Sequence, residues 1–371
     1  MPAILLFSAS FKPASNYFEW VFAKAVTQLG HRVTVLTALD QAPPGSEAAR
    51  IAAAQGISVV GLPVRRWRST LFPKGGHEKV RRLASTHDCA VIAAPNLGFG
   101  YFYVKDLANL PLALCFGETR DFRDTNPWYA RIIKDRWYRN LFARGQKLVC
   151  NQAEALEILR EIGLGKHEER AALIGLPFDE DVFHYDPLLA APGAGHQKRL
   201  VTVTRTGGGS DKPVTGWVAP VLEFLRRRPD WRYRFVGLET DSPSARLLHE
   251  LVEASGVKDR VELRPLLPAS EIVRSYHDSD IALFFRPTIG IQQAMGTGLP
   301  VVLPRSRSSM RHLVTEGYNG FWYESLDQLP EALEHAAANA GERREELARH
   351  NAQWGGREVS RTILEGLLTP L

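Results

Sequence analysis

Cysteine is scarce in this chain. Only three cysteines occur among its 371 residues, and none belongs to a C-x-x-C pair. Cys89, Cys115 and Cys150 are well separated, and each lies in or at the end of an apolar run. An odd number of scattered thiols does not fit a disulfide framework, and it predicts buried thiols in a reducing cytoplasm.

Long apolar runs are also missing. No stretch of 18 or more apolar residues occurs, so the sequence predicts no membrane-spanning helix. The opening residues, MPAILLFSASFK, have no basic region before their apolar run. They predict a first strand rather than a signal peptide.

Acidic residues are absent from Ile281 to Thr315, although the whole chain holds 41 Asp and Glu. Any carboxylate that acts as an acid or a base must therefore come from another segment.

Basic residues are concentrated in the first half. Residues 1–170 hold 23 Lys and Arg against 15 Asp and Glu, whereas the remainder holds 23 against 26. This asymmetry bears on the choice of partners.

The first half alternates short apolar runs with segments of helical period. We expect strands at Ala3–Phe7, Arg32–Leu36, Ile57–Leu62, Cys89–Ala93, Leu112–Phe116 and Lys147–Cys150. We expect helices near Asn16–Leu29, Gly76–Ser85, Pro127–Ala143 and Gln152–Ile162. Asn16 and Glu19 have the spacing of a capping box, and Gly30 is a stop signal for the first helix.

A second series of strands follows residues 186–199, DPLLAAPGAGHQKR, which predict a linker because they are rich in Pro, Gly and Ala. We expect these strands at Leu200–Val203, Arg234–Val236, Val261–Leu263, Ile281–Phe285 and Pro300–Leu303. The sequence thus predicts an α/β protein with two Rossmann-like, doubly wound domains facing a central cleft. The expected limits are 1–185 for the first domain and 200–345 for the second. Residues 346–371 are expected to form a helical tail that packs back on the first domain.

Six short motifs occur in an order typical of one enzyme family. They are Gly30–Val35 (GHRVTV), Ile174–Phe183 (IGLPFDEDVF), Arg205 with Lys212, Val236–Gly237, Gln293–Val302 (QAMGTGLPVV) and Gly317–Phe321 (GYNGF). On these motifs the chain resembles the GT-B glycosyltransferases, especially the large retaining family 4, over nearly its whole length. That family has an E-x7-E motif just ahead of A-M-A-x-G-x-P-V. Here Gln293 stands at the second glutamate, and Phe285 stands eight residues earlier. An unrelated pair of Rossmann-like domains is the alternative.

The resemblance implies a nucleotide-sugar site in the second domain, and residues after its first strand suit a diphosphate. Gly207 and Gly208 let backbone N–H groups approach phosphate oxygens closely. Arg205 and Lys212 flank this loop and can pair with both phosphates. A flexible glycine turn between two solvated cations is the alternative.

Further donor contacts are expected around the acid-free stretch. Gly290 and Ile291 begin a short helix, whose N-terminus offers a second anion site. Gln293 would face the nucleotide ribose, where an amide can bond two hydroxyls. Arg286 can meet a phosphate or an acidic donor sugar, unless it is a solvated surface cation. Leu266 and Leu267 are expected to flank the base.

Two acidic clusters resemble metal motifs. Asp278–Asp280 spells the D-x-D of metal-dependent GT-A transferases, but it precedes its strand instead of following it. Asp179–Asp181 is a second cluster, and both are interpreted as solvated loops. The eleven histidines show no ligand spacing. We expect no metal and no cofactor, with the nucleotide sugar, a UDP-sugar favoured, as a substrate.

The first domain must then supply the acid or base chemistry. The loop after the strand Leu112–Phe116 holds Glu118 and Asp121, and a carboxylate at a strand's carboxyl end suits a general base. An inverting single displacement follows from this arrangement. Either carboxylate can instead pair with Arg120 or Arg123. Three polar residues that follow other strands are expected on the acceptor side: Ser10, Lys12 and Asn96.

Two basic segments with apolar neighbours suit an anionic membrane surface. Arg65–Arg82 holds seven cations against one acid, and Trp128–Lys147 holds six against one. No nucleic-acid-binding module is recognisable. A core stripe with solvated arginines is the alternative for the second segment. The expected location is the cytoplasm, with peripheral contact to the inner face of the cytoplasmic membrane.

The resemblance to the GT-B family implies a glycosyltransferase of the hexosyltransferase type. It would move a sugar from a nucleotide-diphosphate sugar to an acceptor hydroxyl, such as that of a lipid-linked glycan, without a metal and with inversion. The loss of both glutamates leaves open a non-catalytic GT-B protein that binds nucleotide sugars. A sugar-nucleotide epimerase shares the fold, but the acid-free stretch argues against it.

Overall fold

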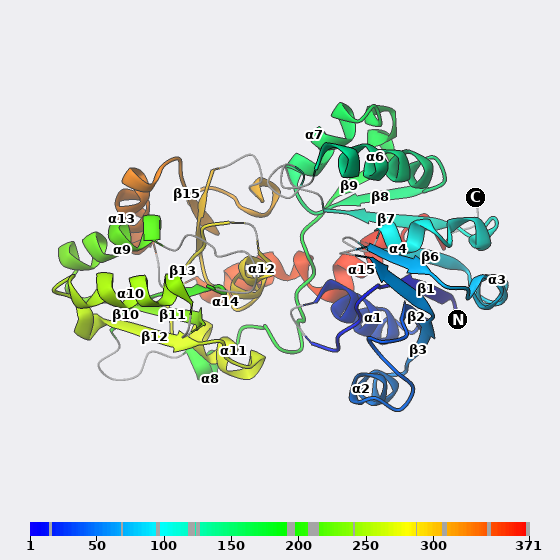
Figure 1. The fold of residues 1–371 in the computed structure, drawn as a ribbon. Coiled ribbons are helices and arrows are strands. Elements are labelled where there is room, and N and C mark those ends of the chain that lie inside the picture. The colour runs from blue at the N-terminus through cyan, green and yellow to red at the C-terminus, as the bar shows by residue number, and fades with distance from the viewer. Residues whose placement is uncertain are drawn as a thin grey trace. The chain divides into compact units, whose positions relative to one another are not determined.

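The structure is a computed structural model, shown as a ribbon in Figure 1. It describes residues 1–14, 17–67, 70–93, 97–117, 123, 127–190, 197–206, 215–239, 242–286, 288–305, 310–339 and 343–368. Contacts divide the chain into two compact units. Unit 1 comprises Met1–Pro177 and Trp354–Leu371, and unit 2 comprises Phe178–Gln353. The sequence patterns place the corresponding limits at residues 185 and 346.

Unit 1 is built on a seven-stranded parallel sheet in the order β3-β2-β1-β6-β7-β8-β9. Its strands are β1 (Ala3–Phe7), β2 (Arg32–Ala38), β3 (Ile57–Leu62), β6 (Cys89–Ile92), β7 (Leu112–Phe116), β8 (Lys147–Cys150) and β9 (Ala171–Leu173). The six strands expected in this half are confirmed. The short strand β9 extends the sheet beyond β8 and was not predicted, because its three residues carry no alternation.

Helices cover both faces of this sheet. They are α1 (Phe18–Gln28), α2 (Glu47–Ala54), α3 (His77–Ala84), α4 (Leu97–Tyr101), α6 (Trp128–Phe142), α7 (Ala153–Glu161) and α15 (Gly356–Leu364). Successive side chains of β1 point to opposite faces. Leu5 and Phe7 therefore join a core with α3, α4, α6 and α7, whereas Ile4 and Leu6 join a core with α1 and α15.

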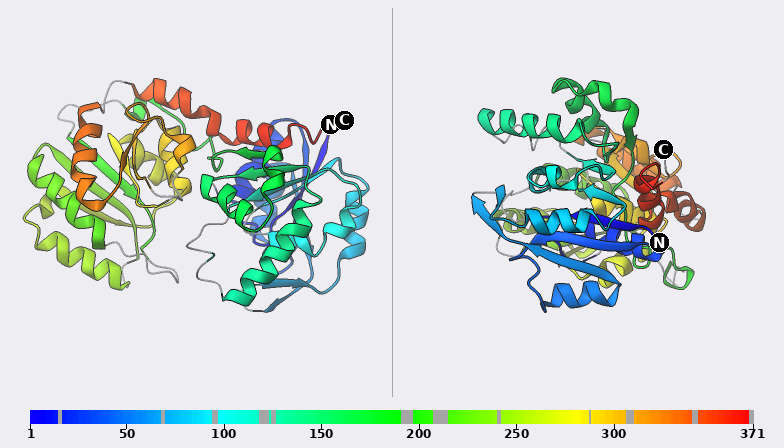
Figure 2. Two further views of the ribbon diagram at one scale, coloured as in Figure 1. Left: turned by 90° about the horizontal axis from the view of Figure 1, so that it is seen from above. Right: turned by 90° about the vertical axis from the view of Figure 1, so that its right-hand side faces the viewer.

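The first and last helices of unit 1 pack against each other, as Figures 1 and 2 show. Val359, Ile363 and Leu364 of α15 share a buried cluster with the apolar residues of α1. The Lys147 ammonium donates to the Glu365 carbonyl oxygen at 2.9 Å and also to that of Thr362. This cation satisfies carbonyl groups at the end of α15 that the helix itself leaves free.

The predicted ends of the first helix can be compared with α1. Helix α1 begins at Phe18 after Tyr17, and the expected cap Asn16 lies outside the described residues. The stop signal is confirmed, because Gly30 has φ 84°. An antiparallel hairpin of β4 (Val64–Trp67) and β5 (Thr70–Pro73) was not predicted, because each of its strands has only four residues.

Unit 2 is built on a six-stranded parallel sheet in the order β12-β11-β10-β13-β14-β15. Its strands are β10 (Lys198–Val203), β11 (Trp231–Leu238), β12 (Val261–Pro265), β13 (Ile281–Leu283), β14 (Val301–Pro304) and β15 (Gly320–Tyr323). The five strands expected here are confirmed. The order reverses between β10 and β13, which is the topological switch point where doubly wound sheets bind ligands.

The helices of unit 2 also cover both faces of the sheet. They are α8 (Pro187–Ala190), α9 (Thr215–Arg227), α10 (Pro243–Glu253), α11 (Ala269–His277), α12 (Ile289–Gly296), α13 (Leu329–Asn339) and α14 (Arg344–Asn351). Helices α9, α10 and α13 share one core cluster with the sheet. Of the other helices, α11 contacts β10 and α12 contacts β14. The prediction of an α/β protein with two doubly wound sheets is confirmed.

The three cysteines are buried free thiols, as predicted. Burial raises the pKa of Cys89 and of Cys150 to about 12, and it raises the pKa of Cys115 further. Thiols held in the protonated form are poor nucleophiles, so these residues have a packing role. No helix among the described residues is long and apolar enough to cross a membrane.

Candidate functional site

The chain after β10 is tied to the end of β11. The Thr204 N–H donates to the Val236 carbonyl at 2.9 Å, and the Thr206 N–H donates to the Gly237 carbonyl at 3.1 Å. The Thr206 hydroxyl accepts a hydrogen bond from the Glu239 N–H at 2.8 Å. The end of β10, which borders the switch point, is thereby fastened to the end of β11.

Gly237 is required for this close approach. Its φ is 113°, and a Cβ at this position would lie 2.1 Å from the Thr204 carbonyl oxygen. A side chain would therefore clash with backbone that has no freedom to move, in a conformation that L-residues avoid. The Val236-Gly237 motif is thus explained by backbone packing at the site.

Arg205 lies between the two anchored threonines and has an exposed side chain. It has no ion-pair partner in the described part of the chain. Its guanidinium is thus exposed at the carboxyl end of β10, and its pairing with a diphosphate stays a prediction. Gly207, Gly208 and Lys212 lie outside the described residues, so their roles stay predictions.

A cavity of about 530 Å³ opens at the carboxyl ends of β10, β13, β14 and β15. Thr204, Arg286, Pro304 and Glu324 line it from these four strand ends. This volume lies in the range of small-molecule sites. The predicted Arg286 thus borders a cavity at the switch point. Its side chain is exposed and has no ion-pair partner among the described residues.

Aromatic rings form the apolar part of this cavity. The Phe285 ring stacks on the indole of Trp217, the third residue of α9, with centroids 3.7 Å apart and planes at 12°. Phe285 stands where the E-x7-E motif has its first glutamate. At this position the chain therefore has a phenyl ring that packs on a buried indole, where the family motif has a carboxylate.

The short helix α12 holds three of the predicted donor residues. Gly290 and Ile291 are buried in its first turn, and the Gly290 carbonyl accepts a hydrogen bond from the Tyr276 hydroxyl at 3.1 Å. Gln293 is only 4% exposed. Its expected contact with ribose stays a prediction. Leu266 and Leu267 follow β12 at its carboxyl end, and Leu266 is exposed.

Buried polar contacts explain two of the motifs around α12. The Asn319 amide donates to the Leu313 carbonyl and to the Asn351 side-chain oxygen, both at 3.0 Å. Asn351 in turn donates to the Met295 carbonyl of α12 at 3.0 Å. The Asn319 motif therefore fastens α12 to α14 and to the segment before β15.

The Arg344 guanidinium supports the same region from α14. It donates to the backbone carbonyls of Tyr276, His277, Ser279 and Thr297. Gly298 packs against the Arg344 backbone, and a Cβ on Gly298 would lie 2.1 Å from its carbonyl oxygen. These contacts hold the C-terminal end of α12 in place.

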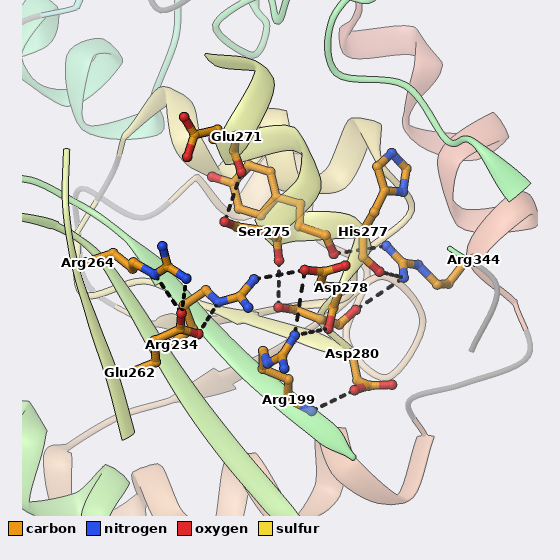
Figure 3. A network of polar contacts seen from close by, with 12 residues as sticks. Arg199, Arg234, Glu262, Arg264, Glu271, Ser275, His277, Asp278, Asp280 and Arg344 are labelled. Carbon is orange, nitrogen blue, oxygen red and sulfur yellow. Dashed lines mark hydrogen bonds and ion pairs between the residues drawn. The ribbon is translucent and has the colours of Figure 1, made fainter. Parts of the chain in front are cut away.

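The D-x-D sequence has a structural role, which Figure 3 shows. The Asp280 carboxylate accepts a hydrogen bond from the Arg199 N–H at 2.7 Å. Asp278 pairs with the Arg234 guanidinium at 3.1 Å, and Arg234 also binds Glu262 at 2.7 Å. Asp280 precedes β13, so this network lies at the opposite end of that strand from the cavity. Among the described residues, no cluster of three or more metal-ligand side chains occurs.

In unit 1, the expected catalytic residues Glu118 and Asp121 and the acceptor-side residue Asn96 lie outside the described residues. Ser10 and Lys12 are exposed after β1, and the Ser10 hydroxyl donates to the Gln41 side chain at 3.2 Å. The structure therefore leaves the proposed general base as a prediction.

Arg123 belongs to the loop that carries Glu118 and Asp121. It forms two hydrogen bonds of 2.8 Å with the two oxygens of Asp135 on α6. This bidentate pair is largely shielded from solvent, with side-chain exposures of 14% and 17%. Such a pair is geometrically well defined. It fastens Arg123 to α6.

Sequence reasoning missed a group of buried polar side chains at the carboxyl ends of β7 and β8. The Gln152 amide donates to the Gly117 carbonyl at 3.2 Å. A Cβ on Gly117 would lie 2.9 Å from the Asn151 side-chain oxygen. Glu19 on α1 is also buried. The available signal was the pair Asn151-Gln152, which directly follows an apolar strand.

The two basic segments are joined by an aromatic cluster. Phe72 of β5 lies 5.2 Å from Phe102, and Phe102 lies 5.4 Å from Trp137 of α6, between ring centroids. Tyr101 stacks on Trp137 at 5.4 Å. The hairpin and α6 are therefore linked through the rings of the segment that holds Tyr101 and Phe102.

The first half of α6 exposes large apolar side chains. Trp128 is 68% exposed and Ile132 is 59% exposed, and Tyr129 and Ile133 are also exposed. We call these four residues the α6 face. Tyr138, Leu141 and Phe142 at the other end of the helix are buried. The core-stripe interpretation therefore holds only for the second half of α6.

Comparison with known families gives a direct match. The profile of the Glycosyl transferase 4-like domain matches residues 19–176, which lie within unit 1. This segment is therefore similar to a glycosyl transferase 4-like domain. No curated protein matches the chain by sequence.

Solved structures extend the likeness over both units. One is HepE from Anabaena in complex with UDP, with a TM-score of 0.72, 17% identity and 99% of each chain covered. Another is a glycosyltransferase from Rickettsia africae, with a TM-score of 0.67, 15% identity and coverage of 98% and 99%. A third is sucrose-phosphate synthase from Thermosynechococcus elongatus, with a TM-score of 0.63 and 13% identity. The match covers 99% of this chain and 96% of the synthase. The predicted GT-B fold is confirmed.

Proposed function

We propose that this glycosyltransferase uses a nucleoside-diphosphate sugar, with a UDP-sugar favoured, and transfers the sugar to an acceptor hydroxyl. The observation that carries the proposal is the cavity at four strand ends of unit 2, where Thr204 and Arg286 line it and Arg205 follows Thr204. Ligands of doubly wound sheets bind at this edge. The likeness to HepE, a structure in complex with UDP, supports uridine as the nucleoside.

In this proposal the protein's own cations hold the diphosphate. Arg205 pairs with its oxygens together with Lys212, and the backbone N–H groups of Gly207 and Gly208 complete the contacts. Guanidinium and ammonium groups neutralise the phosphates, so the proposed reaction needs no metal. The nucleotide sugar is a substrate, and no cofactor takes part.

The proposed chemistry is a single displacement. Glu118, with Asp121 as second choice, accepts the proton of the acceptor hydroxyl. The acceptor oxygen bonds to the anomeric carbon while the bond from that carbon to the phosphate oxygen breaks, and the diphosphate leaves with the electron pair. Arg205 stabilises the charge that develops on the leaving group. The product therefore has the inverted configuration.

The acceptor is proposed to be a glycan at a membrane surface, lipid-linked in the simplest case. The exposed α6 face lies on a helix rich in Lys and Arg, and this combination suits anionic lipids. Ser10, Lys12 and Asn96 are proposed to contact the acceptor. The enzyme would act in the cytoplasm, at the inner face of the membrane.

A thermal-shift panel of UDP-, GDP-, TDP- and ADP-sugars tests the donor, because a ligand that binds only the folded state raises the unfolding midpoint. We expect the largest shift with a UDP-sugar, and a smaller one for Arg205→Gln. Arg232→Gln is the matched control, because Arg232 is an exposed arginine near the start of β11. No shift with any donor would contradict the proposal.

The base and the stereochemistry need a separate experiment. Proton NMR of the product should show the inverted anomeric configuration, and Glu118→Gln should lower turnover by about 100-fold or more. A retained configuration rules out Glu118 as a simple base. Full turnover in both Glu118→Gln and Asp121→Asn places the base elsewhere.

A non-catalytic nucleotide-sugar-binding protein is the second candidate function. It is favoured by Phe285 and Gln293 at the two positions of the E-x7-E motif. This candidate predicts the same thermal shifts but no release of nucleotide with any acceptor. An epimerase is disfavoured, because the acid-free stretch from Ile281 to Thr315 offers no carboxylate.

A further inference from the structure

We propose that the donor carries an acidic sugar, a uronic acid, and that Arg286 binds its carboxylate. This inference rests on the proposed function, because it names the sugar for which the unit 2 cavity is built. Three observations support it: the charges that line the cavity, the stacking of Phe285 on Trp217, and the position of Arg205 after a different strand from Arg286.

The charges around the cavity leave one cation without a counter-charge. Arg286 and Glu324 are the charged residues that line it in the described part of the chain. Glu324 is engaged by Arg305, whose guanidinium lies 3.4 Å from its carboxylate. Arg286 has no such partner among the described residues. Arg305 also lies 3.7 Å from Glu316, so it is shared between two carboxylates. Arg286 is therefore the lining cation that no carboxylate of the described residues engages.

The diphosphate does not need this charge. Arg205 follows β10, whereas Arg286 follows β13, the neighbouring strand across the switch point. Arg205 and the predicted Lys212 already supply two cations for the phosphates. A guanidinium on the next strand can meet a further anionic group of the same ligand, and a carboxylate matches its planar geometry.

The aromatic contact removes the usual means of binding a neutral sugar. A carboxylate at position 285 could accept hydrogen bonds from sugar hydroxyls, but Phe285 accepts none, and its ring is stacked on Trp217. Apolar rings, Thr204 and Thr288 line the same cavity as Arg286. Recognition therefore shifts from hydroxyl groups to the charge on the sugar.

Isothermal titration with four ligands tests this inference: UDP, UDP-glucose, UDP-glucuronate and UDP-galacturonate. The chain should bind at least one of the two uronates about tenfold more tightly than UDP-glucose. Arg286→Gln should abolish that preference and leave the affinity for UDP within about twofold. Arg286→Lys should keep part of the preference for the uronate over UDP-glucose, and the control Arg232→Gln should keep all of that preference.

The outcomes separate this inference from the proposed function. Binding of UDP and UDP-glucose with no preference for either uronate overturns the acidic sugar and leaves the glycosyltransferase proposal standing. An equal loss of UDP and UDP-uronate affinity in Arg286→Gln also overturns it, because Arg286 would then bind phosphate. No binding of any of the four ligands contradicts the proposed UDP-sugar function itself.

Discussion

The indole of Trp217 lies face to face with the ring of Phe285, 3.7 Å away between centroids. It also stacks on Phe235 of β11 at 5.6 Å. Trp217 is 5% exposed and belongs to the core cluster of unit 2, whereas Phe285 borders the cavity. One aromatic stack thus joins the hydrophobic core to the candidate donor site.

Removal of the indole should destabilise unit 2. Trp217→Ala should lower the free energy of unfolding by about 3–5 kcal/mol, because a buried aromatic side chain leaves a cavity. Phe285→Leu is the matched variant, because it keeps an apolar side chain at the partly exposed end of the stack and should cost about 1 kcal/mol. Urea titration followed by circular dichroism measures both. Equal stability of Trp217→Ala and wild type would contradict the role of the stack.

Gly237 should be irreplaceable at the end of β11. Gly237→Ala should lower the free energy of unfolding by about 3 kcal/mol or more, because the methyl group would meet the Thr204 carbonyl oxygen. The variant should also lose affinity for nucleotide, since Arg205 is held by the same strand ends. Thermal unfolding with and without UDP measures both effects.

Gly256→Ala is the control for this prediction. Gly256 has φ 74°, and a Cβ there would have no neighbour within 4 Å. It should show only the backbone strain of a left-handed residue, about 1 kcal/mol. A similar loss in the two variants would mean that conformation, and not the clash at Thr204, makes Gly237 necessary.

Stability should fall as the pH drops below neutrality. Burial and, to a lesser degree, Arg344 lower the pKa of His277 from 6.5 to about 4, against the smaller opposing effects of the His184 backbone and of Asp186. The folded state therefore disfavours the protonated imidazole. The stabilisation is complete above pH 6.5 and is lost as the pH falls toward 4, by about 2 kcal/mol after allowance for solvent screening.

Urea midpoints at pH 7.5 and pH 5 measure this effect, and His277→Phe should reduce the difference between them. Burial also lowers the pKa of His31, His87 and His167, so a smaller slope of the same sign should remain in the variant. A variant whose midpoint shifts as much as that of the wild type would exclude His277 as a main contributor.

The α6 face should bind anionic membranes. Flotation with phosphatidylglycerol vesicles should show binding at low salt and weaker binding at high salt, because salt screens the attraction. Trp128→Ser combined with Ile132→Ser should abolish flotation. Leu188→Ser, at an exposed apolar residue of unit 2, should not. No flotation of the wild type at low salt would reject the membrane surface.

The sequence predicted the features that depend on local pattern. Apolar runs predicted eleven parallel strands, and the motif Val236-Gly237 lies near the end of one of them, β11. The resemblance also located Phe285 and Gln293 correctly in relation to β13 and α12. These features could be predicted because strand period and glycine position are encoded within a few residues.

Contacts between distant residues could not be predicted. Nothing in the sequence pairs Trp217 with Phe285, or Arg123 with Asp135, because such pairs depend on how strands and helices are placed in three dimensions. The D-x-D residues illustrate the same point. Their position before β13 argued against a metal, but only the structure identified Arg199 and Arg234 as their partners.

The return of the last helix to unit 1 has a consequence for biosynthesis. The chain leaves the ribosome from its N-terminus, and α1 cannot bury its apolar side chains against Val359, Ile363 and Leu364 until those residues have been made. Unit 2, which ends at Gln353, can complete its own core first. The part of the protein that is synthesised first is therefore the part that finishes folding last.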